Sequence, residues 1–572
     1  MRSNAASIFR IRILGGFFIA FALLLIVRLY FVQIVHGAEY RKDAFAQYVS
    51  PQADSDTRSS IFFSDIKGRL VAAAVMQSGW RVAISPKDII DPEEVYKAIK
   101  SVTDIDSVRF YASAGKKNDP YEEVAFRVND DAAQAIRAKK IPGAILVQDQ
   151  WRLYPGKDLG AHVVGFVGYK GDTKTGVYGL EKAYNDTLLE KVSGTQINPF
   201  AEIFANARAL LSTDPAAHQG SIITTIEPNV EQQLEDVLDG VMKTYTPRLA
   251  GGIVMDPHTG EIIAMGIRPA YDPNTYNLVS NPRTFSNVLV EGRYEMGSIM
   301  KPLTVAAGID AGAVTRATTY DDKGCITKSG KKVCNFDFKA RGVVPLQEIL
   351  NQSLNLGVSF ITDTMGHGTF AKYVHLYGLG EKSGIDLPDE VTGDISAIDK
   401  GADIDYASAS FGQGIAVSPI AMIRALAVLA NGGVLPRPHI VQGIKYENGV
   451  TRSISPSLGT QILSTKSTDD VTDMLVTVFD KALLKGAVKQ EHYSIAAKTG
   501  TAQIGITGGG GYYKDRYLHS FFGYFPAYQP KFIVFLFTVE PHGAEFASAT
   551  LAHPFVDLAK YIINYYQIPP DR

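Results

Sequence analysis

Three short motifs with reactive side chains follow one another in the second half of the chain. Ser298 and Lys301 form an S-x-x-K pair, Ser353 and Asn355 form an S-x-N pair, and residues 498–501 read K-T-G-T. A serine hydroxyl becomes a nucleophile only beside a base, and a lysine three residues further along a helix lies on the same face. The set therefore predicts acyl transfer through a serine.

The order of the motifs carries more information than any one of them. S-x-x-K also occurs at Ser64/Lys67, Ser113/Lys116 and Ser329/Lys332, and K-T-G recurs at 174–176, whereas S-x-N occurs once. Without the other two motifs, Ser298 would be interpreted as an ordinary helix N-cap. The single ordered set favours catalysis.

A lysine base near neutral pH needs a strongly lowered pKa. The pKa of Lys301 would have to fall from ~10.4 to roughly 7 or 8, which costs about 4 kcal/mol. A helix N-terminus supplies at most ~2 kcal/mol, so desolvation and a second cation, Lys498, must supply most of the shift. In the K-T-G-T strand, Gly500 would let a substrate backbone approach, and the hydroxyls of Thr499 and Thr501 could hold a carboxylate. The alternative is an edge strand protected by its lysine.

Composition narrows the remaining classes of function. The chain has 572 residues, 46% of them hydrophobic, and a net charge of −2. This length favours two or more folded domains, and the near-neutral charge argues against nucleic acid as a partner. The metal and nucleotide motifs H-E-x-x-H and G-x-x-x-x-G-K-[ST] are absent from the sequence, so neither a metal nor another cofactor is expected.

The two cysteines lie in the stretch "GCITKSGKKVC". A two-residue turn at Ser329 and Gly330 would pair Cys325 with Cys334 across a hairpin, with Cα atoms ~4.5 Å apart. That spacing permits a disulfide, with two free thiols as the alternative.

The N-terminus predicts a membrane anchor. Residues 13–35 are almost entirely apolar, and 23 helical residues span ~34 Å, enough for a bilayer core. Arg2, Arg10 and Arg12 precede this run, which keeps a tail of residues 1–12 in the cytoplasm and sends the rest across. A cleaved signal peptide is the alternative, but "VHGA" is a poor cleavage site.

Two modules follow the anchor. Residues 36–218 carry short alternating runs such as "GRLVAAAV", "WRVAIS" and "GAILVQ", typical of a β-rich module with a few helices. Residues 219–572 predict an α+β domain, an antiparallel sheet covered by helices. Its expected elements are a strand at 221–226, a helix at 227–245, a hairpin turning at 256–260, strands at 519–526 and 531–540, and a final helix at 551–566.

The chain resembles the class B penicillin-binding proteins, the monofunctional peptidoglycan transpeptidases, over nearly its whole length. Gly297 and Pro302 flank the serine motif as in that family, and "YASASFGQGIAVSPI" at 406–420 is similar to its FGQG segment. "RLYPGKDLGAHVVGFVG" and "GLEKAYN" are similar to segments of the family's pedestal, or dimerisation-type, domain. "RSSIFFSDIKG" departs from the family pattern: it keeps Arg58 and Ile61 but loses a glycine and an aspartate, which leaves the packing there open.

The resemblance implies roles for the motif residues. Ser298 would attack the penultimate D-Ala carbonyl of a peptidoglycan stem peptide, with Lys301 as the base. Ser353 and Lys498 would relay the proton to the leaving amine, and an amine of a neighbouring stem would accept the acyl group. The backbone amides of Ser298 and Thr501 would form the oxyanion hole, and β-lactams would acylate the serine. The substrate-binding residues would be Asn355, Thr499, Gly500 and Thr501.

Several alternatives remain within and beyond this family. A D-Ala-D-Ala carboxypeptidase would use the same site with water as acceptor. A β-lactamase is disfavoured because class A β-lactamases place their glutamate after the S-D-N motif, whereas Glu348 precedes S-L-N. A bifunctional class A penicillin-binding protein would need a glycosyltransferase module before the pedestal, and the sequence leaves no room for one there. An inactive division scaffold is the alternative outside enzymes.

S-x-N favours the septal, cell-division type over the elongation type. The predicted anchor gives a single-pass protein of the bacterial inner membrane, with its N-terminus in the cytoplasm and its catalytic domain on the periplasmic side. A SEDS-family glycosyltransferase and other division proteins would be partners through the membrane helix and pedestal.

Overall fold

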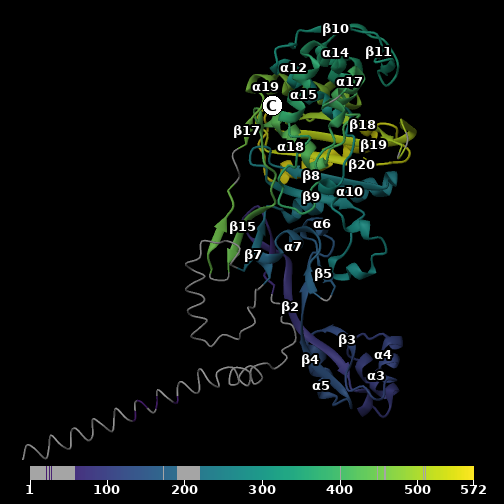
Figure 1. Cartoon of the computed structure of the whole chain (residues 1–572), viewed down its shortest axis with the longest axis vertical. Coiled ribbons are helices and arrows are strands. Elements are labelled where there is room, and N and C mark those ends of the chain that lie inside the picture. Colours follow the sequence, from purple (N-terminus) through teal and green to yellow (C-terminus); the bar gives the residue numbers. More distant parts are fainter. Residues whose placement is uncertain are drawn as a thin grey trace, which may run out of the picture. The chain divides into compact units, whose positions relative to one another are not determined.

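The computed structural model of the chain (Figure 1) describes residues 58–171, 173–189, 219–399, 401–446, 449–455, 459–506, 508 and 510–572, and four helical residues at 21, 23, 25 and 28. The described residues from Arg58 onward belong to one compact unit. The predicted tail at 1–12 and the anchor at 13–35 lie outside the described residues, those four excepted. Among the described helices, none is both long and apolar enough to cross a membrane.

A five-stranded antiparallel sheet forms the centre of the second predicted module, residues 219–572. Its strand order is β18-β19-β20-β8-β9, so β18 is an edge strand. The predicted hairpin at 256–260 joins β8 to β9, and the predicted strands at 519–526 and 531–540 fall in β19 and β20, which confirms these elements. The strands are β8 Leu249–Met255, β9 Ile262–Arg268, β18 Ala496–Gly505, β19 Tyr512–Phe525 and β20 Phe532–Val539.

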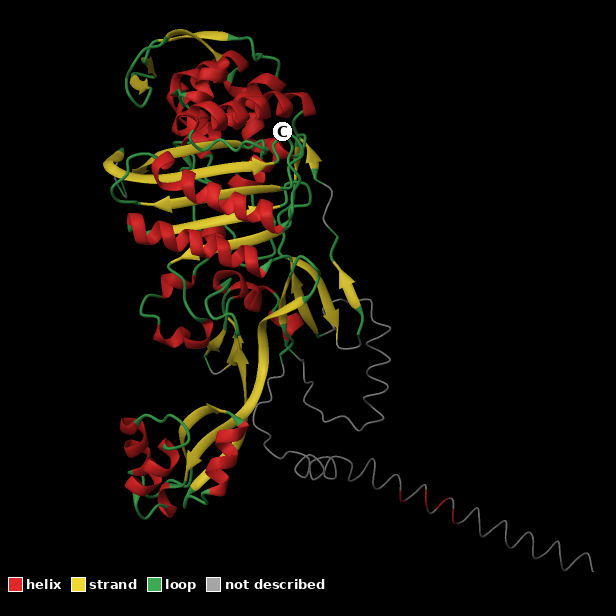
Figure 2. Cartoon of the chain, turned by 180° about the vertical axis from the view of Figure 1, so that it is seen from behind, coloured by secondary structure: helices red, strands yellow, loops and turns green. Residues whose placement is uncertain are grey.

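Helices cover both faces of this sheet, which Figure 1 and Figure 2 show from opposite sides. On one face, Phe521 and Phe525 of β19 pack against Phe555 of helix α20 (Ala547–Tyr565). On the other face, Phe522 and Tyr524 belong to the core that contains helix α18 (Pro419–Ala430). Because successive side chains of a strand point to opposite faces, two covered faces make every position apolar. This explains the continuous hydrophobic runs and confirms the α+β class.

Helix α10 (Pro228–Tyr245) packs beside α20 on the first of these faces. Its buried side chains include Val230, Leu234, Leu238 and Val241, which recur at helical spacing as the sequence predicts. The helix begins where the Glu227 side chain accepts the Val230 N–H, which satisfies one of the free donors of the first turn.

A helical layer packs along the edge strand β18 (Figure 1). It contains the 3-10 turn η6 (Gly297–Met300), which runs directly into α12 (Lys301–Asp310), together with α13 (Leu346–Asn351), α14 (Asn355–Met365) and α19 (Thr465–Thr477). Two of the three motifs lie in this layer and the third lies on β18. The three motifs therefore meet where the helices contact the sheet.

A second, larger sheet joins strands from both predicted modules. Its order is β16-β15-β7-β1-β2-β3, with β4 also paired to β2. Ile61 of β1 pairs in parallel with Ile222 of β7, and β15 pairs with the other edge of β7. Segments on the two sides of the predicted boundary at 218/219 thus share one sheet. The strands are β1 Ile61–Ser64, β2 Leu70–Ile84, β3 Glu122–Val128, β4 Ala144–Leu153, β7 Gly220–Thr224, β15 Val441–Tyr446 and β16 Thr451–Ser453.

Strand β2 differs from the expectation of two short strands in this region. The runs "GRLVAAAV" and "WRVAIS" form one strand, because β4 pairs with it from Val75 to Ile84. Gly79 does not end the strand. A Cβ at Gly79 would lie 2.6 Å from the Trp151 ring and 2.6 Å from the Val128 carbonyl, so only glycine allows this close packing.

The altered "RSSIFFSDIKG" segment is nevertheless firmly packed. The buried carboxylate of Glu181 accepts from Arg58 at 2.5 Å and from Arg152 at 2.7 Å. Arg58 also donates to the Asn185 amide at 3.0 Å. Arg58, Arg152 and Glu181 come from the three segments that resemble the family's pedestal. One buried ionic cluster therefore packs the altered segment against the other two.

Candidate active site

Ser298 lies in the η6 turn rather than in a regular α-helix. The sequence predicts a helix that starts at this serine, but α12 begins at Lys301. A 3-10 turn has three residues per revolution, so positions i and i+3 point in the same direction. The turn therefore still directs Ser298 and Lys301 to one side. The Ser298 hydroxyl is half-buried and has no hydrogen-bond partner among the described side chains or backbone groups.

Lys301 is fully buried and binds the S-L-N segment. Its Nζ donates to the carbonyl oxygen of Ser353 at 2.5 Å and to the Ser353 hydroxyl at 3.1 Å. Ser353 has a φ of +56°, a left-handed conformation that is uncommon outside glycine. It lies in the turn between α13 and α14, and this conformation directs both of its oxygens to the same lysine.

Lys498 reaches the same hydroxyl from the sheet. Its Nζ donates to the Ser353 hydroxyl at 3.2 Å and to the Thr499 carbonyl at 2.9 Å. Lys498 is also buried, with 3% of its surface exposed. The Ser353 hydroxyl thus connects two lysines that are far apart in the sequence, as the acyl-transfer hypothesis requires.

Both lysines have lowered pKa values. Burial is the main cause for Lys301, and the nearby Lys498 cation lowers the Lys301 pKa further, well below its ordinary value. Burial lowers the pKa of Lys498 to about 7. These are the two causes inferred from the sequence, desolvation and a second cation. A buried amine that loses its proton easily can serve as a general base near neutral pH.

Gly500 has a packing role that the sequence did not predict. A Cβ there would lie 2.3 Å from the Ser520 hydroxyl and 2.7 Å from the Met296 carbonyl. The missing side chain therefore lets the protein's own η6 turn approach β18, while the approach of a substrate backbone stays a prediction. The Ser520 hydroxyl donates to the Met296 carbonyl at 2.8 Å, which fixes the residue just before the turn.

Thr499 and Thr501 occupy alternate positions of β18 and are half-buried. The Thr501 hydroxyl accepts the N–H of Ala547, the first residue of α20, at 3.1 Å. Because β18 is an edge strand, its outer edge can pair with an extended peptide.

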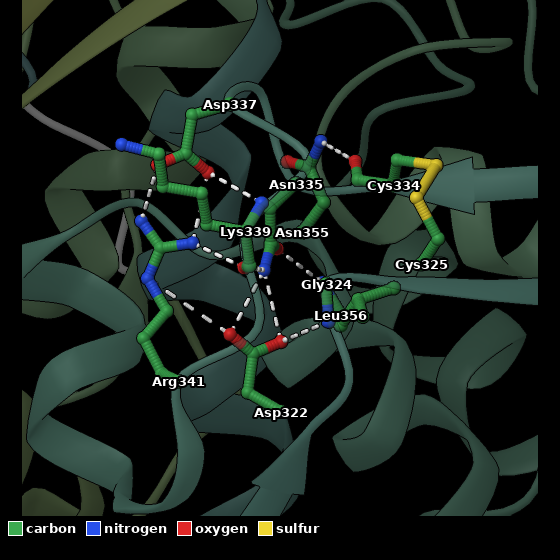
Figure 3. Close-up of a disulfide and its surroundings, with 10 residues drawn as sticks. All are labelled: Asp322, Gly324, Cys325, Cys334, Asn335, Asp337, Lys339, Arg341, Asn355 and Leu356. Carbon is green, nitrogen blue, oxygen red and sulfur yellow. Dashed lines mark hydrogen bonds and ion pairs between the residues drawn. A yellow bond between two sulfur atoms is a disulfide. The ribbon is translucent and has the colours of Figure 1, made fainter.

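Asn355 is the first residue of α14 and is attached to the disulfide hairpin. Strands β11 (Cys325–Lys328) and β12 (Lys331–Cys334) pair Cys325 with Cys334, the register predicted from the turn, and the two cysteines form a disulfide. The Asn355 amide donates to the Cys334 carbonyl at 2.9 Å (Figure 3). This leaves the Asn355 side-chain oxygen available to accept a hydrogen bond.

Glu295 is a site residue that the sequence analysis missed. Its carboxylate accepts from the N–H of Gly414, in the FGQG segment, at 3.0 Å and from the Tyr512 hydroxyl at 3.2 Å. Burial raises its pKa. The available signal was a single acid three residues before Ser298 in "YEMGSIM". Glu295 connects the segment before Ser298 to the FGQG segment and to β19.

Two family models match this chain. Residues 250–559 match the family described as the penicillin binding protein transpeptidase domain, and residues 56–201 match the penicillin-binding protein dimerisation domain. The first match alone covers more than half of the chain. The fold and site define a serine acyltransferase of the penicillin-recognising kind. The chain belongs to the penicillin-binding protein transpeptidase family, as a class B member.

Relatives are similar along most of their length. Peptidoglycan D,D-transpeptidase FtsI of Escherichia coli K12 is 25% identical over 579 residues, covering 98% of this chain and 92% of the relative. Stage V sporulation protein D of Bacillus subtilis is 27% identical over 500 residues, covering 85% and 75%.

Solved structures share the fold at lower sequence identity. Penicillin binding protein 2X of Streptococcus thermophilus has a TM-score of 0.71 at 19% identity, covering 90% of this chain and 80% of that one. Penicillin binding protein 3 of Mycobacterium tuberculosis, complexed with ampicillin, has a TM-score of 0.68 at 19% identity, covering 90% and 97%.

Proposed function

We propose that this protein is a peptidoglycan D,D-transpeptidase that crosslinks stem peptides through an acyl-enzyme on Ser298. One observation carries the proposal: the Ser353 hydroxyl accepts hydrogen bonds from two buried lysines, Lys301 and Lys498, next to the turn that bears Ser298. This arrangement provides a proton acceptor for the nucleophile and a route for the proton to the leaving group. The names of its full-length relatives support the same activity.

In the first half-reaction, the Ser298 hydroxyl attacks the carbonyl carbon of the penultimate D-Ala. Neutral Lys301 takes the hydroxyl proton as the C–O bond forms. The C–N bond to the terminal D-Ala then breaks, and the leaving amine receives a proton through Ser353, supplied by Lys301 or Lys498. The products are an ester on Ser298 and free D-Ala.

In the second half-reaction, an amine of a neighbouring stem attacks the ester. The amine loses a proton to the lysine and serine relay, the ester C–O bond breaks, and Ser298 regains its proton. The backbone amides of Ser298 and Thr501 would stabilise the oxyanion in both halves. The new amide bond is the crosslink.

Substrate binding is assigned to the two sides of the site. Asn355 would accept a hydrogen bond from the substrate amide through its side-chain oxygen. Thr499 and Thr501 would hold the terminal carboxylate beside Lys498. A β-lactam mimics the D-Ala-D-Ala end, so it would form the same ester without a departing amine.

Labelling with a fluorescent penicillin tests the proposal. The unmutated protein is expected to form a covalent adduct that mass spectrometry locates on Ser298, and Ser298→Ala is expected to form none. Absence of an adduct on the unmutated protein would refute the proposal that it is an acyl-enzyme-forming transpeptidase. Incubation with stem pentapeptide and an amine acceptor then separates crosslinked dimer from the tetrapeptide that a carboxypeptidase would release.

We further propose the cellular setting that the sequence suggests. Residues 13–35 would anchor the protein in the inner membrane, with residues 1–12 in the cytoplasm, 36–218 as pedestal and 219–572 as catalytic domain on the periplasmic side. A septal role is supported by S-L-N and by the relatives named FtsI. A SEDS-family glycosyltransferase and other division proteins would then be partners through the membrane helix and pedestal. A fluorescent fusion enriched at midcell supports this role, and an even distribution along the lateral wall would indicate an elongation enzyme.

A further inference from the structure

A buried asparagine outside the three motifs is bonded to the S-L-N segment. Asn335 directly follows Cys334 and is 1% exposed. Its side-chain oxygen accepts the backbone N–H of Leu356 at 3.2 Å. Leu356 is the second residue of α14, and the residue before this helix, Leu354, provides no side-chain cap. Asn335 therefore caps α14 from a distant segment.

The amide nitrogen of Asn335 is held just as firmly. It donates to both carboxylate oxygens of Asp322, at 2.9 and 3.0 Å. Asp322 ends strand β10 (Thr319–Asp322) and is fully buried. Figure 3 shows this carboxylate facing the asparagine in the cluster of residues beside the disulfide. Both ends of the Asn335 amide are thus fixed, and the side chain has little freedom to rotate.

The segment that carries Asn335 also contacts the S-L-N motif on both sides. The Cys334 carbonyl accepts from the Asn355 amide at 2.9 Å. Before the motif, the Arg341 guanidinium donates to the Gln352 amide oxygen at 3.0 Å. Arg341 also pairs with Asp337 at 2.8 Å. The hairpin and the loop after it therefore bracket Ser353 and Asn355.

We propose that Asn335 is a positioning residue for the transpeptidase reaction. It joins buried Asp322 to the first turn of α14, and in doing so fixes the Asn355 side chain in the orientation that binds the substrate amide. This inference rests on the proposed function. Asn335 contacts no substrate itself and acts through Asn355.

The consequence is a specific pattern in acylation kinetics. In the full-length protein in detergent, Asn335→Ala is expected to slow penicillin acylation roughly 10- to 100-fold, as for a binding group displaced by up to about 1 Å. Added to Asn355→Ala, the same substitution should slow acylation further by less than about twofold, because residues that act as a unit are not additive. Lys331→Ala, on the exposed end of the same hairpin, is the control and should react at the normal rate.

Exchanging the side chains of Asp322 and Asn335 distinguishes a loss of positioning from a loss of folding. Asn335→Asp places two carboxylates side by side and should slow acylation. The double variant Asp322→Asn, Asn335→Asp restores one amide and one carboxylate, so the rate should return to within about threefold of normal. Thermal unfolding of each variant shows whether the fold is retained.

The outcomes separate this inference from the proposed function. An unmutated protein that penicillin does not acylate refutes the function. A reactive unmutated protein refutes the inference if Asn335→Ala reacts normally, if its effect multiplies fully with that of Asn355→Ala, or if the folded exchange variant stays as slow as Asn335→Asp.

Discussion

The Nζ of Lys301 lies 2.5 Å from the carbonyl oxygen of Ser353 and 3.1 Å from its hydroxyl oxygen. Neither oxygen carries a negative charge that would stabilise a buried ammonium. The hydrogen bonds therefore orient the amine, while burial and the Lys498 cation weaken its hold on the proton. Among the described residues, this amine is held in place without a carboxylate partner.

Removing the second cation should change the pH dependence of acylation. Because Lys498 lowers the pKa of Lys301, the uncharged isostere Lys498→Met should raise that pKa. The acid limb of the acylation rate, where Lys301 gains a proton, is then expected to move to higher pH, in addition to a loss of rate. The measurement is the second-order rate constant for penicillin acylation between pH 4 and 10. An acid limb that stays in place or moves to lower pH would contradict this coupling.

Gly500→Ala should disturb the η6 turn that bears Ser298. The added Cβ would lie 2.3 Å from the Ser520 hydroxyl and 2.7 Å from the Met296 carbonyl. Such crowding typically lowers the free energy of unfolding by about 1–3 kcal/mol, and it should also slow acylation by displacing Ser298. Gly240→Ala in α10 is the matched control, since a Cβ there meets no atom within 4 Å. It should be neutral or slightly stabilising. Equal effects of the two substitutions in urea unfolding would rule out the close approach as the cause.

Glu181→Gln should destabilise the compact unit strongly. It would leave the Arg58 and Arg152 guanidiniums buried without a counter-charge. Loss of one partner from a buried ionic cluster typically costs about 3–5 kcal/mol. The comparison is Asp473→Asn, which breaks the exposed pair with Arg316 and should cost at most about 1 kcal/mol. Denaturant unfolding measures the free energy of unfolding of both variants. Similar small decreases in the two would show that the buried cluster does not stabilise the fold strongly.

Removing the disulfide should lower the thermal unfolding midpoint and abolish the effect of reductant on that midpoint. The bridge joins residues nine positions apart, and closing a loop of this size is worth about 2–3 kcal/mol in the chain-entropy account. Cys325→Ser with Cys334→Ser is therefore expected to unfold at a lower temperature than the oxidised protein. Dithiothreitol should lower the midpoint of the unmutated protein and leave that of the variant unchanged. If dithiothreitol lowered the midpoint of the unmutated protein and of the variant equally, the disulfide would not be the cause of the effect.

Sequence reasoning found the elements whose pattern is local. The apolar runs of β19 and β20, the helical face of α10 and the hairpin between β8 and β9 each depend on neighbouring residues, so periodicity sufficed. The S-x-x-K, S-x-N and K-T-G-T motifs were found because their order is distinctive. The Cys325 to Cys334 register followed from one turn.

What sequence reasoning missed depends on distant partners. Strand β2 continues through its polar middle because β4 pairs with it, and Gly500 is needed because Met296 and Ser520 approach it. In the sequence, Asn335 is an asparagine in a polar loop, and only the structure shows its hydrogen bonds with Asp322 and Leu356. Long-range packing decides each of these cases, and a local pattern does not contain it.

The pairing of Ile61 with Ile222 limits how this protein can be shortened. A fragment that begins at residue 219 would keep β7 paired to β15 on one side but leave its other side bare. Unpaired backbone groups along such a strand recruit strands from other molecules. A truncated catalytic fragment is therefore prone to self-association, and soluble preparations of this enzyme should retain the chain from Arg58 onward.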